Sequence, residues 1–217
     1  MSTDAPQHLL DIESTPRVFI DRVLERALAL KAGAPPAPSC RDRLLVNLFY
    51  EPSTRTRVSF EVAALRLGMR VVNIAAADRS VKKGDTLMDT VRTLQAMAPD
   101  VVVVRHPDNG ALQPLAGAAD SGVHLVNAGD GSRAHPTQAL LDVVTLLSQF
   151  DRLDDLIVVV AGDLHHSRVT RSGVALMKAL GVGEVRLCAP PGLEAGPRVS
   201  EGTRKFDDLD AALDGAD

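Results

Sequence analysis

The residues best suited to chemistry are concentrated in one short segment, Glu51-Pro-Ser-Thr-Arg-Thr-Arg57, between a predicted strand and a predicted helix. Its serine and threonines offer hydroxyl and backbone N–H donors, and Arg55 offers a planar fork of donors. The N-terminus of the helix adds the positive end of its dipole. Together these groups favour a phosphate or phosphoryl site, although serine and threonine also cap many ordinary helices.

Further polar residues follow the ends of other predicted strands. They are Arg105, His106, residues 135–138, residues 162–163 and Arg168. Ligands of open parallel sheets bind at the carboxyl ends of strands, so polar groups at several strand ends indicate one shared site. Residues 51–105 hold nine Lys and Arg against six Asp and Glu, in a chain of net charge −4. This local positive charge suits a small anionic ligand.

Ser80-Val-Lys-Lys-Gly84 is a basic loop before a predicted helix, and it is either a solvated loop or a mobile lid that carries charge to a phosphate. No P-loop or dinucleotide glycine motif is present, which argues against those nucleotide sites. His165 and His166 are adjacent, so their side chains are not expected to share a direction, and Cys40 and Cys188 are far apart in sequence. We therefore expect no metal, no disulfide framework and no cofactor.

Short apolar runs alternate with segments of helical period along the chain. Strands are predicted over residues 44–50, 71–75, 101–104, 123–127, 156–161 and 184–187. Helices are predicted over residues 16–32, 54–67, 85–98, 111–119, 136–150, before residue 180 and over 209–213, with Thr15 capping the first. This alternation predicts right-handed βαβ units and parallel sheets.

The helical periodicity also predicts which side chains face a core. The expected buried faces are Phe19, Val23, Ala27 and Leu30 in the first helix, Val58, Val62 and Leu65 in the second, and Leu87, Val91, Leu94 and Ala98 in the third. Four consecutive valines, residues 101–104, predict a strand that is buried on both faces.

We expect a long helix over residues 136–150 and a polar turn over 151–155 to link two sheets. We expect an α/β protein of two doubly wound parallel-sheet domains: residues 1–150, including the linking helix, and a partial second domain over 151–217. Only two clear strands fall in the second domain, and residues 214–217 resemble the turn into another strand. We therefore expect the chain to stop within that domain.

Composition excludes several classes of protein. The net charge is −4 and aromatic residues are 3% of the chain, so nucleic-acid binding is not expected. No stretch reaches the ~20 apolar residues of a membrane span, and residues 1–7 do not resemble a signal peptide. We expect a cytoplasmic protein.

Several of these segments resemble one family. Phe49-Tyr-Glu-Pro-Ser-Thr-Arg-Thr-Arg-Val-Ser-Phe60 resembles the carbamoyl-phosphate signature of the aspartate and ornithine carbamoyltransferases. Arg105-His-Pro107, His135-Pro-Thr-Gln138 and Gly162-Asp-Leu-His-His-Ser-Arg168 resemble later blocks of that family, in the same order. The resemblance runs from about His8 to the end of the chain. Glu51-Pro52, the 80–86 loop and residues 166–172 are more similar to the aspartate type than to the ornithine type.

This resemblance implies a residue for each part of the reaction. The phosphate of carbamoyl phosphate would be held by Ser53, Thr54, Arg55 and Thr56. Its carbonyl oxygen would lie among Arg105, His135 and Thr56, and Gln138 would contact the carbamoyl amine. Arg168 would bind a carboxylate of aspartate. Ser80 and Lys83 would come from a neighbouring subunit of a homotrimer. Lys83 would also act in catalysis and in aspartate binding.

The implied reaction moves the carbamoyl group to the amine of L-aspartate, as in de novo pyrimidine synthesis, and needs no covalent nucleophile. We expect His135 to donate a hydrogen bond rather than act as the general base; the leaving phosphate could accept the amine proton. The family continues into more of an aspartate-binding domain, so we expect the 217 residues alone to have little or no activity. Whether the protein also assembles with regulatory or dihydroorotase-like partner chains stays open.

Two alternative functions remain at this stage. One is transfer to ornithine or another amino acid. The other is a non-catalytic subunit that binds a phosphorylated ligand, which the presence of Arg55, Lys83, Arg105 and His135 disfavours.

Overall fold

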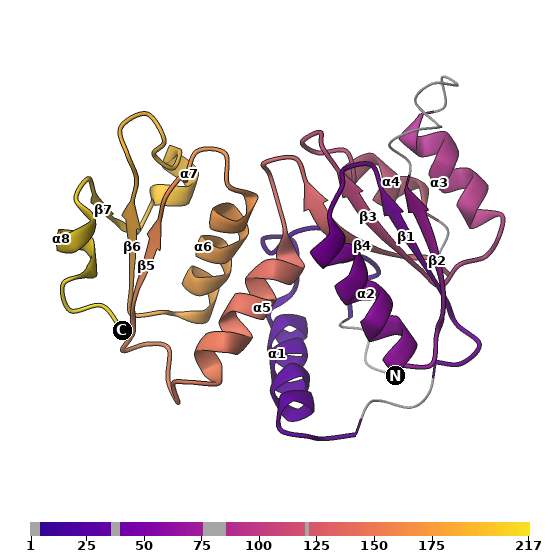
Figure 1. The fold of residues 1–217 in the computed structure, drawn as a ribbon, viewed down its shortest axis with the longest axis horizontal. Helices are drawn as coiled ribbons and strands as arrows, with labels where there is room; N and C mark the ends of the chain where they lie inside the picture. The colour runs from indigo at the N-terminus through magenta and orange to yellow at the C-terminus, as the bar shows by residue number, and fades with distance from the viewer. Residues whose placement is uncertain (1–4, 36–39, 76–85, 120–121) are drawn as a thin grey trace.

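The computed structural model describes residues 5–35, 40–75, 86–119 and 122–217 and contains two parallel sheets (Figure 1). The first sheet has strand order β2-β1-β3-β4 and the second has order β5-β6-β7. The first-sheet strands are β1 Leu44–Phe49, β2 Arg70–Ala75, β3 Val101–His106 and β4 His124–Asp130. The second-sheet strands are β5 Ile157–Ala161, β6 Glu184–Cys188 and β7 Arg204–Phe206. All strand pairs are parallel, which confirms the predicted α/β class.

The helices fill the connections between strands. They are α1 Arg17–Lys31, α2 Thr54–Arg66, α3 Leu87–Gln95, α4 Gln113–Ala118, α5 Pro136–Leu147, α6 Arg168–Leu180, α7 Pro197–Ser200 and α8 Leu209–Leu213. We call residues 5–150 the first lobe and residues 151–217 the second lobe. In Figure 1, α5 and α6 lie side by side between the two sheets, with α1 next to α5. The division into two folding domains stays a prediction.

The first sheet is buried on both faces, as its valine run predicts. Val102 and Val104 pack in one apolar cluster, with Leu48 and Leu125, whereas Val103 packs in another on the opposite face. A third cluster joins the lobes and contains Ile20 and Leu24 of α1, Leu140 and Val143 of α5, and Leu176 of α6. These clusters fix the strand ends and the helix starts that form the site below.

The first helix differs from the prediction by one residue. The Thr15 hydroxyl donates to the carbonyl of Asp11 instead of capping the helix, and Pro16 is the N-cap. The buried face holds Ile20 and Leu24, because these two side chains meet α5. The predicted face of Phe19, Val23, Ala27 and Leu30 is only half-buried or exposed.

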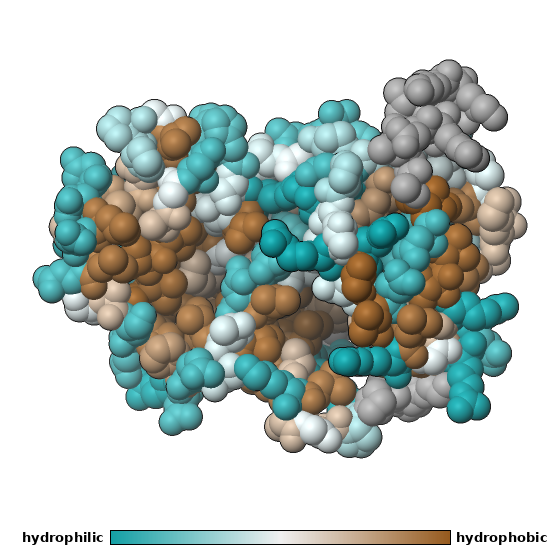
Figure 2. Space-filling model, viewed as in Figure 1, coloured by the Kyte–Doolittle hydropathy of each residue, from teal (hydrophilic) through white to brown (hydrophobic). Residues whose placement is uncertain are grey.

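The prediction of which side of α2 is buried is also wrong. Val58, Val62 and Leu65 are 43%, 39% and 57% exposed. Ala64 and Phe60 make the contact with the first sheet instead, and they lie on a different side of the helix. Figure 2 shows brown, apolar side chains along α2 on the surface of the molecule. The apolar pattern is real, but within the described residues no part of the chain covers it.

The third helix begins at Leu87, after a Thr86 capping box with Asp89, and ends at Gln95. Val91 and Leu94 are buried as predicted. Ala98 lies beyond the helix with a φ of +51° and is exposed, so it does not continue the buried face.

The second lobe contains a helix and a strand that the sequence did not predict, α7 and β7. The strand β7 pairs with β6 although it is three residues long and lacks an apolar run. Arg186 and Arg204 lie over the ring of Phe206, at 5.5 Å and 5.3 Å from its centroid. At the other edge, the Asp217 N–H donates to the Ile157 carbonyl at 3.2 Å, which places residue 217 beside β5. Where the structure describes the chain, no helix is long and apolar enough to cross a membrane.

Candidate active site

The candidate site lies where three strand ends of the first sheet meet the starts of three helices. Glu51 follows β1 and Arg105 lies one residue before the end of β3, while the turn after β4 leads into His135. Arg168 opens α6 from the second lobe and reaches the same place. Because parallel strands bring their carboxyl ends to one edge, the sequence predicted this meeting point.

A single carboxylate joins the two arginines. Arg105 Nη2 donates to Glu51 Oε1 at 2.8 Å, and Arg168 Nη2 donates to the same oxygen at 3.0 Å. Arg168 Nη1 donates to Glu51 Oε2 at 3.2 Å. Burial opposes ionisation of Glu51, but the hydrogen bonds from Arg168 and Arg105 outweigh it, so the pKa of the carboxyl lies below its usual value. Two guanidiniums around one carboxylate leave a net positive charge in the site.

Backbone carbonyls hold the same two arginines. Arg105 Nη1 donates to the Ala128 carbonyl at 3.1 Å, and Arg168 Nη1 donates to the Gly131 carbonyl at 2.8 Å. Gly129 lies between them with a φ of +128°. A Cβ there would be 3.0 Å from Arg105 Nη1 and 3.1 Å from Arg168 Cζ, so the close approach requires glycine.

His135 is a buried N-cap of α5 beside these cations. Its backbone N–H donates to Ser172 Oγ of α6 at 2.9 Å, which ties it to the second lobe. Burial and then the positive charges of Arg168 and Arg105 lower the pKa of the imidazole to about 4, with Glu51 acting in the opposite direction. The ring is therefore neutral at neutral pH and can donate one hydrogen bond, but it is a weak base.

The residues at the start of α2 are more exposed than Arg105, Arg168 and His135 and have fewer partners. Ser53 is the N-cap in an extended conformation, and its hydroxyl makes no capping bond; it donates to Thr56 Oγ1 at 3.0 Å. Thr54 and Arg55 are exposed. Among the residues described, none forms a hydrogen bond or ion pair with the Arg55 side chain. The unpaired N–H groups of the first helical turn and this free guanidinium form a place for an anion.

Gln138 lies in the first turn of α5. Its side-chain amide donates to Asp142 Oδ1 at 2.8 Å. Burial raises the pKa of the Asp142 carboxyl, although the bond from Gln138 opposes this. The Gln138 amide oxygen has no donor in the described part of the chain, so it can accept a hydrogen bond from an amine.

Not every predicted residue joins this group. Ser80 and Lys83 lie outside the described residues. His106 packs against Tyr50, with ring centroids 5.1 Å apart, and Asp163 pairs with exposed His166 at 2.9 Å. In the described ranges no three His, Cys, Asp or Glu residues are arranged to hold a metal ion. Sequence reasoning gave no structural role to Glu51, Gly129 or Ser172; the Gly-Asp-Gly turn at 129–131 is the one signal that could have indicated a tight approach.

The geometry supports a specific chemistry. Arg105 and Arg168 are fixed cations, and His135 is a neutral donor next to them. The Nε of Arg105 is buried and has no partner among the described residues. Such a group of preorganised donors can hold an anion and stabilise negative charge that grows on a carbonyl oxygen.

Comparison with known proteins decides the family. Residues 7–148 match the family described as aspartate/ornithine carbamoyltransferase, carbamoyl-P binding domain. This chain belongs to the aspartate/ornithine carbamoyltransferase family. The match confirms the resemblance drawn from the residue segments.

Curated carbamoyltransferases are similar over almost the whole chain. The aspartate carbamoyltransferase catalytic subunit of Gluconobacter oxydans is 46% identical over 98% of this chain and 68% of that protein. The subunit of the same name from Xanthomonas oryzae is 45% identical over 97% of this chain and 69% of its own length. The chain thus spans about two thirds of each of these carbamoyltransferases.

Solved carbamoyltransferases of both types share the fold. Aspartate transcarbamoylase from Trypanosoma cruzi, in complex with carbamoyl aspartate and phosphate, has a TM-score of 0.85 and 31% identity over 100% of this chain and 75% of that one. The same enzyme with N-(phosphonacetyl)-L-aspartic acid has a TM-score of 0.87 and 30% identity, over 100% of this chain and 72% of that one. Ornithine carbamoyltransferase from Thermus thermophilus has a TM-score of 0.86 and 28% identity, over 95% of this chain and 70% of its own. The fold is therefore common to both substrate types.

Proposed function

We propose that this protein transfers the carbamoyl group of carbamoyl phosphate to the amine of L-aspartate, giving N-carbamoyl-L-aspartate and phosphate. The observation that carries the proposal is the meeting of Arg105, Arg168 and His135 beside the open start of α2. The curated relatives named above are aspartate carbamoyltransferase catalytic subunits. The reaction is the one that serves de novo pyrimidine synthesis, and we propose a cytoplasmic location for it.

The phosphate of carbamoyl phosphate would lie against the start of α2. The groups that would hold it are those of Ser53, Thr54, Arg55 and Thr56. The free Arg55 guanidinium and the first-turn N–H groups supply charge and donors without breaking any bond of the fold.

The carbonyl oxygen would lie among Arg105, His135 and Thr56. The aspartate nitrogen attacks the carbonyl carbon, a C–N bond forms, and the C–O bond to the phosphate breaks. Negative charge grows on the carbonyl oxygen and on the leaving phosphate, and one fixed donor is typically worth ~3 kcal/mol to such a transition state. The low pKa of His135 favours its role as a donor, and the leaving phosphate accepts the amine proton.

The amine and the second substrate would use the α5 and α6 residues. The free amide oxygen of Gln138 accepts from the carbamoyl amine, and Arg168 binds a carboxylate of aspartate. Because Arg168 also binds Glu51, the substrate carboxylate would share this guanidinium with Glu51. Lys83 would add a further charge for catalysis and aspartate binding.

A second copy of this chain would complete the site. We propose a homotrimer in which Ser80 and Lys83 reach the site of a neighbouring subunit. The exposed apolar face of α2 supports self-association, since Val58, Val62 and Leu65 begin one turn after the candidate phosphate site. Val62→Glu should lower the assembly state in analytical ultracentrifugation, whereas Val72→Glu, at an exposed valine of β2, should not. An unchanged assembly in the Val62 variant would reject this face.

The activity is tested on the protein purified from its native source. It is mixed with ¹³C-carbamoyl phosphate and either L-aspartate or L-ornithine, and the products are identified by mass spectrometry. We expect labelled N-carbamoyl-L-aspartate. Labelled citrulline would indicate the ornithine type, and tight binding of carbamoyl phosphate without transfer to either amine would indicate a non-catalytic binding subunit.

A further inference from the structure

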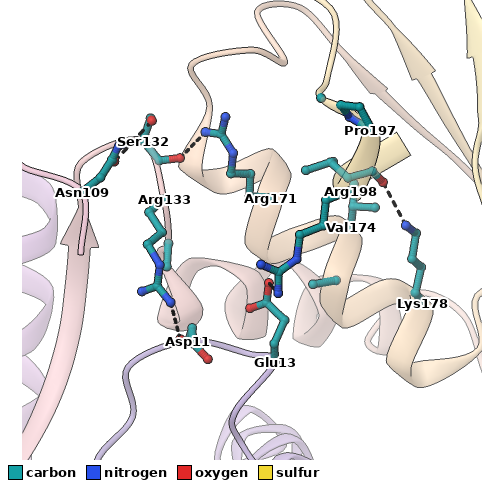
Figure 3. A pocket seen from close by; sticks show the side chains of 14 residues that line it. Asp11, Glu13, Asn109, Ser132, Arg133, Arg171, Val174, Lys178, Pro197 and Arg198 are labelled. Carbon is teal, nitrogen blue, oxygen red and sulfur yellow. Dashed lines mark hydrogen bonds and ion pairs between the residues drawn. The ribbon is translucent and has the colours of Figure 1, made fainter. Parts of the chain in front are cut away.

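A second polar cleft of about 660 Å³ lies at the junction of the two lobes (Figure 3). We call it the junction cleft; it lies between the segment around Asp11 and Glu13, the turn at Ser132, and helices α6 and α7. Its volume is in the range of sites that bind small molecules. None of the residues assigned above to carbamoyl phosphate or aspartate lines it.

The charges that line this cleft do not balance. Four cationic side chains line it, against two carboxylates: Arg133, Arg171, Lys178 and Arg198 against Asp11 and Glu13. Figure 3 shows Arg133 directed at Asp11, and Arg198 directed at Glu13. These ion pairs are 2.9 Å and 3.6 Å long, and Arg133 Nη1 also pairs with buried Asp130 at 3.3 Å. Both lining carboxylates are therefore already paired with a cation of the cleft.

The other two cations bind only neutral groups among the described residues. Arg171 donates to the carbonyls of Ser132 and His165, and Lys178 Nζ donates to the Val199 carbonyl at 2.9 Å. Arg171 and Lys178 are seven residues apart, so they share one face of α6, with Val174 between them. A carbonyl satisfies a donor but leaves its charge uncompensated, and an anion forms stronger, charge-assisted bonds with the same groups.

We propose that the junction cleft binds a small organic phosphate. A phosphate monoester carries close to two negative charges at neutral pH, which matches Arg171 and Lys178, the two lining cations that have no carboxylate partner among the described residues. The planar fork of Arg171 suits two phosphate oxygens, and Lys178 and exposed Arg198 can reach a third. Val174 and Pro197 provide an apolar wall for the organic part of the ligand.

This site is separate from the candidate active site. Adjacent residues of one turn contact the two sites: Arg168 donates to the Gly131 carbonyl, and Arg171 donates to the Ser132 carbonyl. Arg168 and Arg171 lie about one turn apart on α6. The two sites therefore use different guanidiniums, and variants can remove one without touching the other.

The test is calorimetric titration with glycerol 3-phosphate. Lys178→Gln/Arg198→Gln removes two cations from the cleft, and both side chains are exposed. Arg152→Gln/Arg204→Gln is the matched control, because it removes the same charge from exposed arginines outside the cleft. We expect at least a tenfold loss of affinity in the first variant and none in the control.

Arg55→Gln distinguishes the two sites. Glycerol 3-phosphate should bind this variant as it binds the original protein, whereas carbamoyl phosphate should bind it more weakly. The junction cleft proposal is overturned if the original protein does not bind glycerol 3-phosphate at millimolar concentration, if the cleft variant and the control bind equally, or if Arg55→Gln abolishes binding. Failure of the proposed function appears separately, as unchanged carbamoyl phosphate affinity in Arg55→Gln.

Discussion

The two halves of the candidate active site hold their cations in different ways. Arg105 and Arg168 are largely buried, with side chains 9% and 16% exposed. Both bind Glu51, and each also donates to a backbone carbonyl in β4 or directly after it. Arg55 is exposed and free of partners among the described residues. A buried guanidinium needs a partner in the folded protein at all times, whereas an exposed one is solvated by water. The first half is thus part of the fold, and we propose that the second binds a ligand.

Arg105→Gln should have the largest effect, because it breaks the buried half. It removes the shorter of the hydrogen bonds to Glu51, at 2.8 Å, and the donor that we propose for the carbonyl oxygen. We expect carbamoyl phosphate binding to be lost and the free energy of unfolding to fall by about 3 kcal/mol, the scale for breaking a buried pair. Urea unfolding and calorimetry measure the two effects. Arg43→Gln, at an exposed arginine paired with Asp100, should change neither; a stable Arg105 variant would contradict the comparison.

Arg55→Gln should separate binding from stability. It removes a charge-assisted contact to phosphate but no contact of the fold, so carbamoyl phosphate affinity should fall by roughly 100-fold. The free energy of unfolding should change by less than about 0.5 kcal/mol. Arg66→Gln, at the far end of α2, is the control and should bind normally. If Arg55→Gln destabilised the protein as Arg105→Gln does, the two halves would not differ as described.

Gly129→Ala tests the buried half of the site without removing a charge. The added Cβ displaces the Arg105 and Arg168 guanidiniums, and we expect roughly tenfold weaker carbamoyl phosphate binding. The positive φ adds backbone strain of about 1 kcal/mol or more. Gly162→Ala is matched for strain, with a φ of +123° and nothing within 4 Å of its Cβ. It should lose stability but keep its affinity; equal loss of affinity in both variants would show that strain alone is responsible.

His135 differs from the other site residues because its effect on stability depends on pH. Its folded pKa of about 4 lies below the unfolded value, so between about pH 6.5 and pH 4 the unfolded chain binds a proton that the folded chain does not. Stability therefore falls as pH is lowered through this window, by up to about 3 kcal/mol. Urea unfolding from pH 7 to pH 4 should show a shallower slope for His135→Gln, and an unchanged slope for exposed His165→Gln. Equal slopes in all three proteins would mean that His135 titrates normally.

The sequence predicted the position of the site better than its internal contacts. Alternating strands and helices place residues 53–56, Arg105 and His135 after strands of the first sheet and Arg168 after a strand of the second, and the structure brings Arg105, His135 and Arg168 together beside the start of α2. The bridging role of Glu51 was not predicted, because a spacing pattern does not show which arginines a carboxylate will meet. Gly129 was missed for the same reason, since its need for glycine arises from two side chains that approach from other segments.

The helix faces show a second limit of sequence patterns. Periodicity identified an apolar stripe on α2 but not which side meets the sheet, and Ala64 with Phe60 makes that contact instead. In α1 the buried face is shifted by one residue, because α5 supplies its partner. The short strand β7 was missed because hydrogen bonds to β6 and the packing of Phe206 among arginines define it, rather than an apolar run.

The most direct measurement is a crystal structure of the protein with carbamoyl phosphate bound. We expect the phosphate at the start of α2, against Arg55 and the first-turn N–H groups, with the carbonyl oxygen directed at Arg105 and His135 and both arginines still bound to Glu51. A phosphate bound between Arg105 and Arg168 with Glu51 displaced, and Arg55 still free, would contradict it. In that case the buried cations would be the ligand site, and the division between fold and ligand drawn here would be wrong.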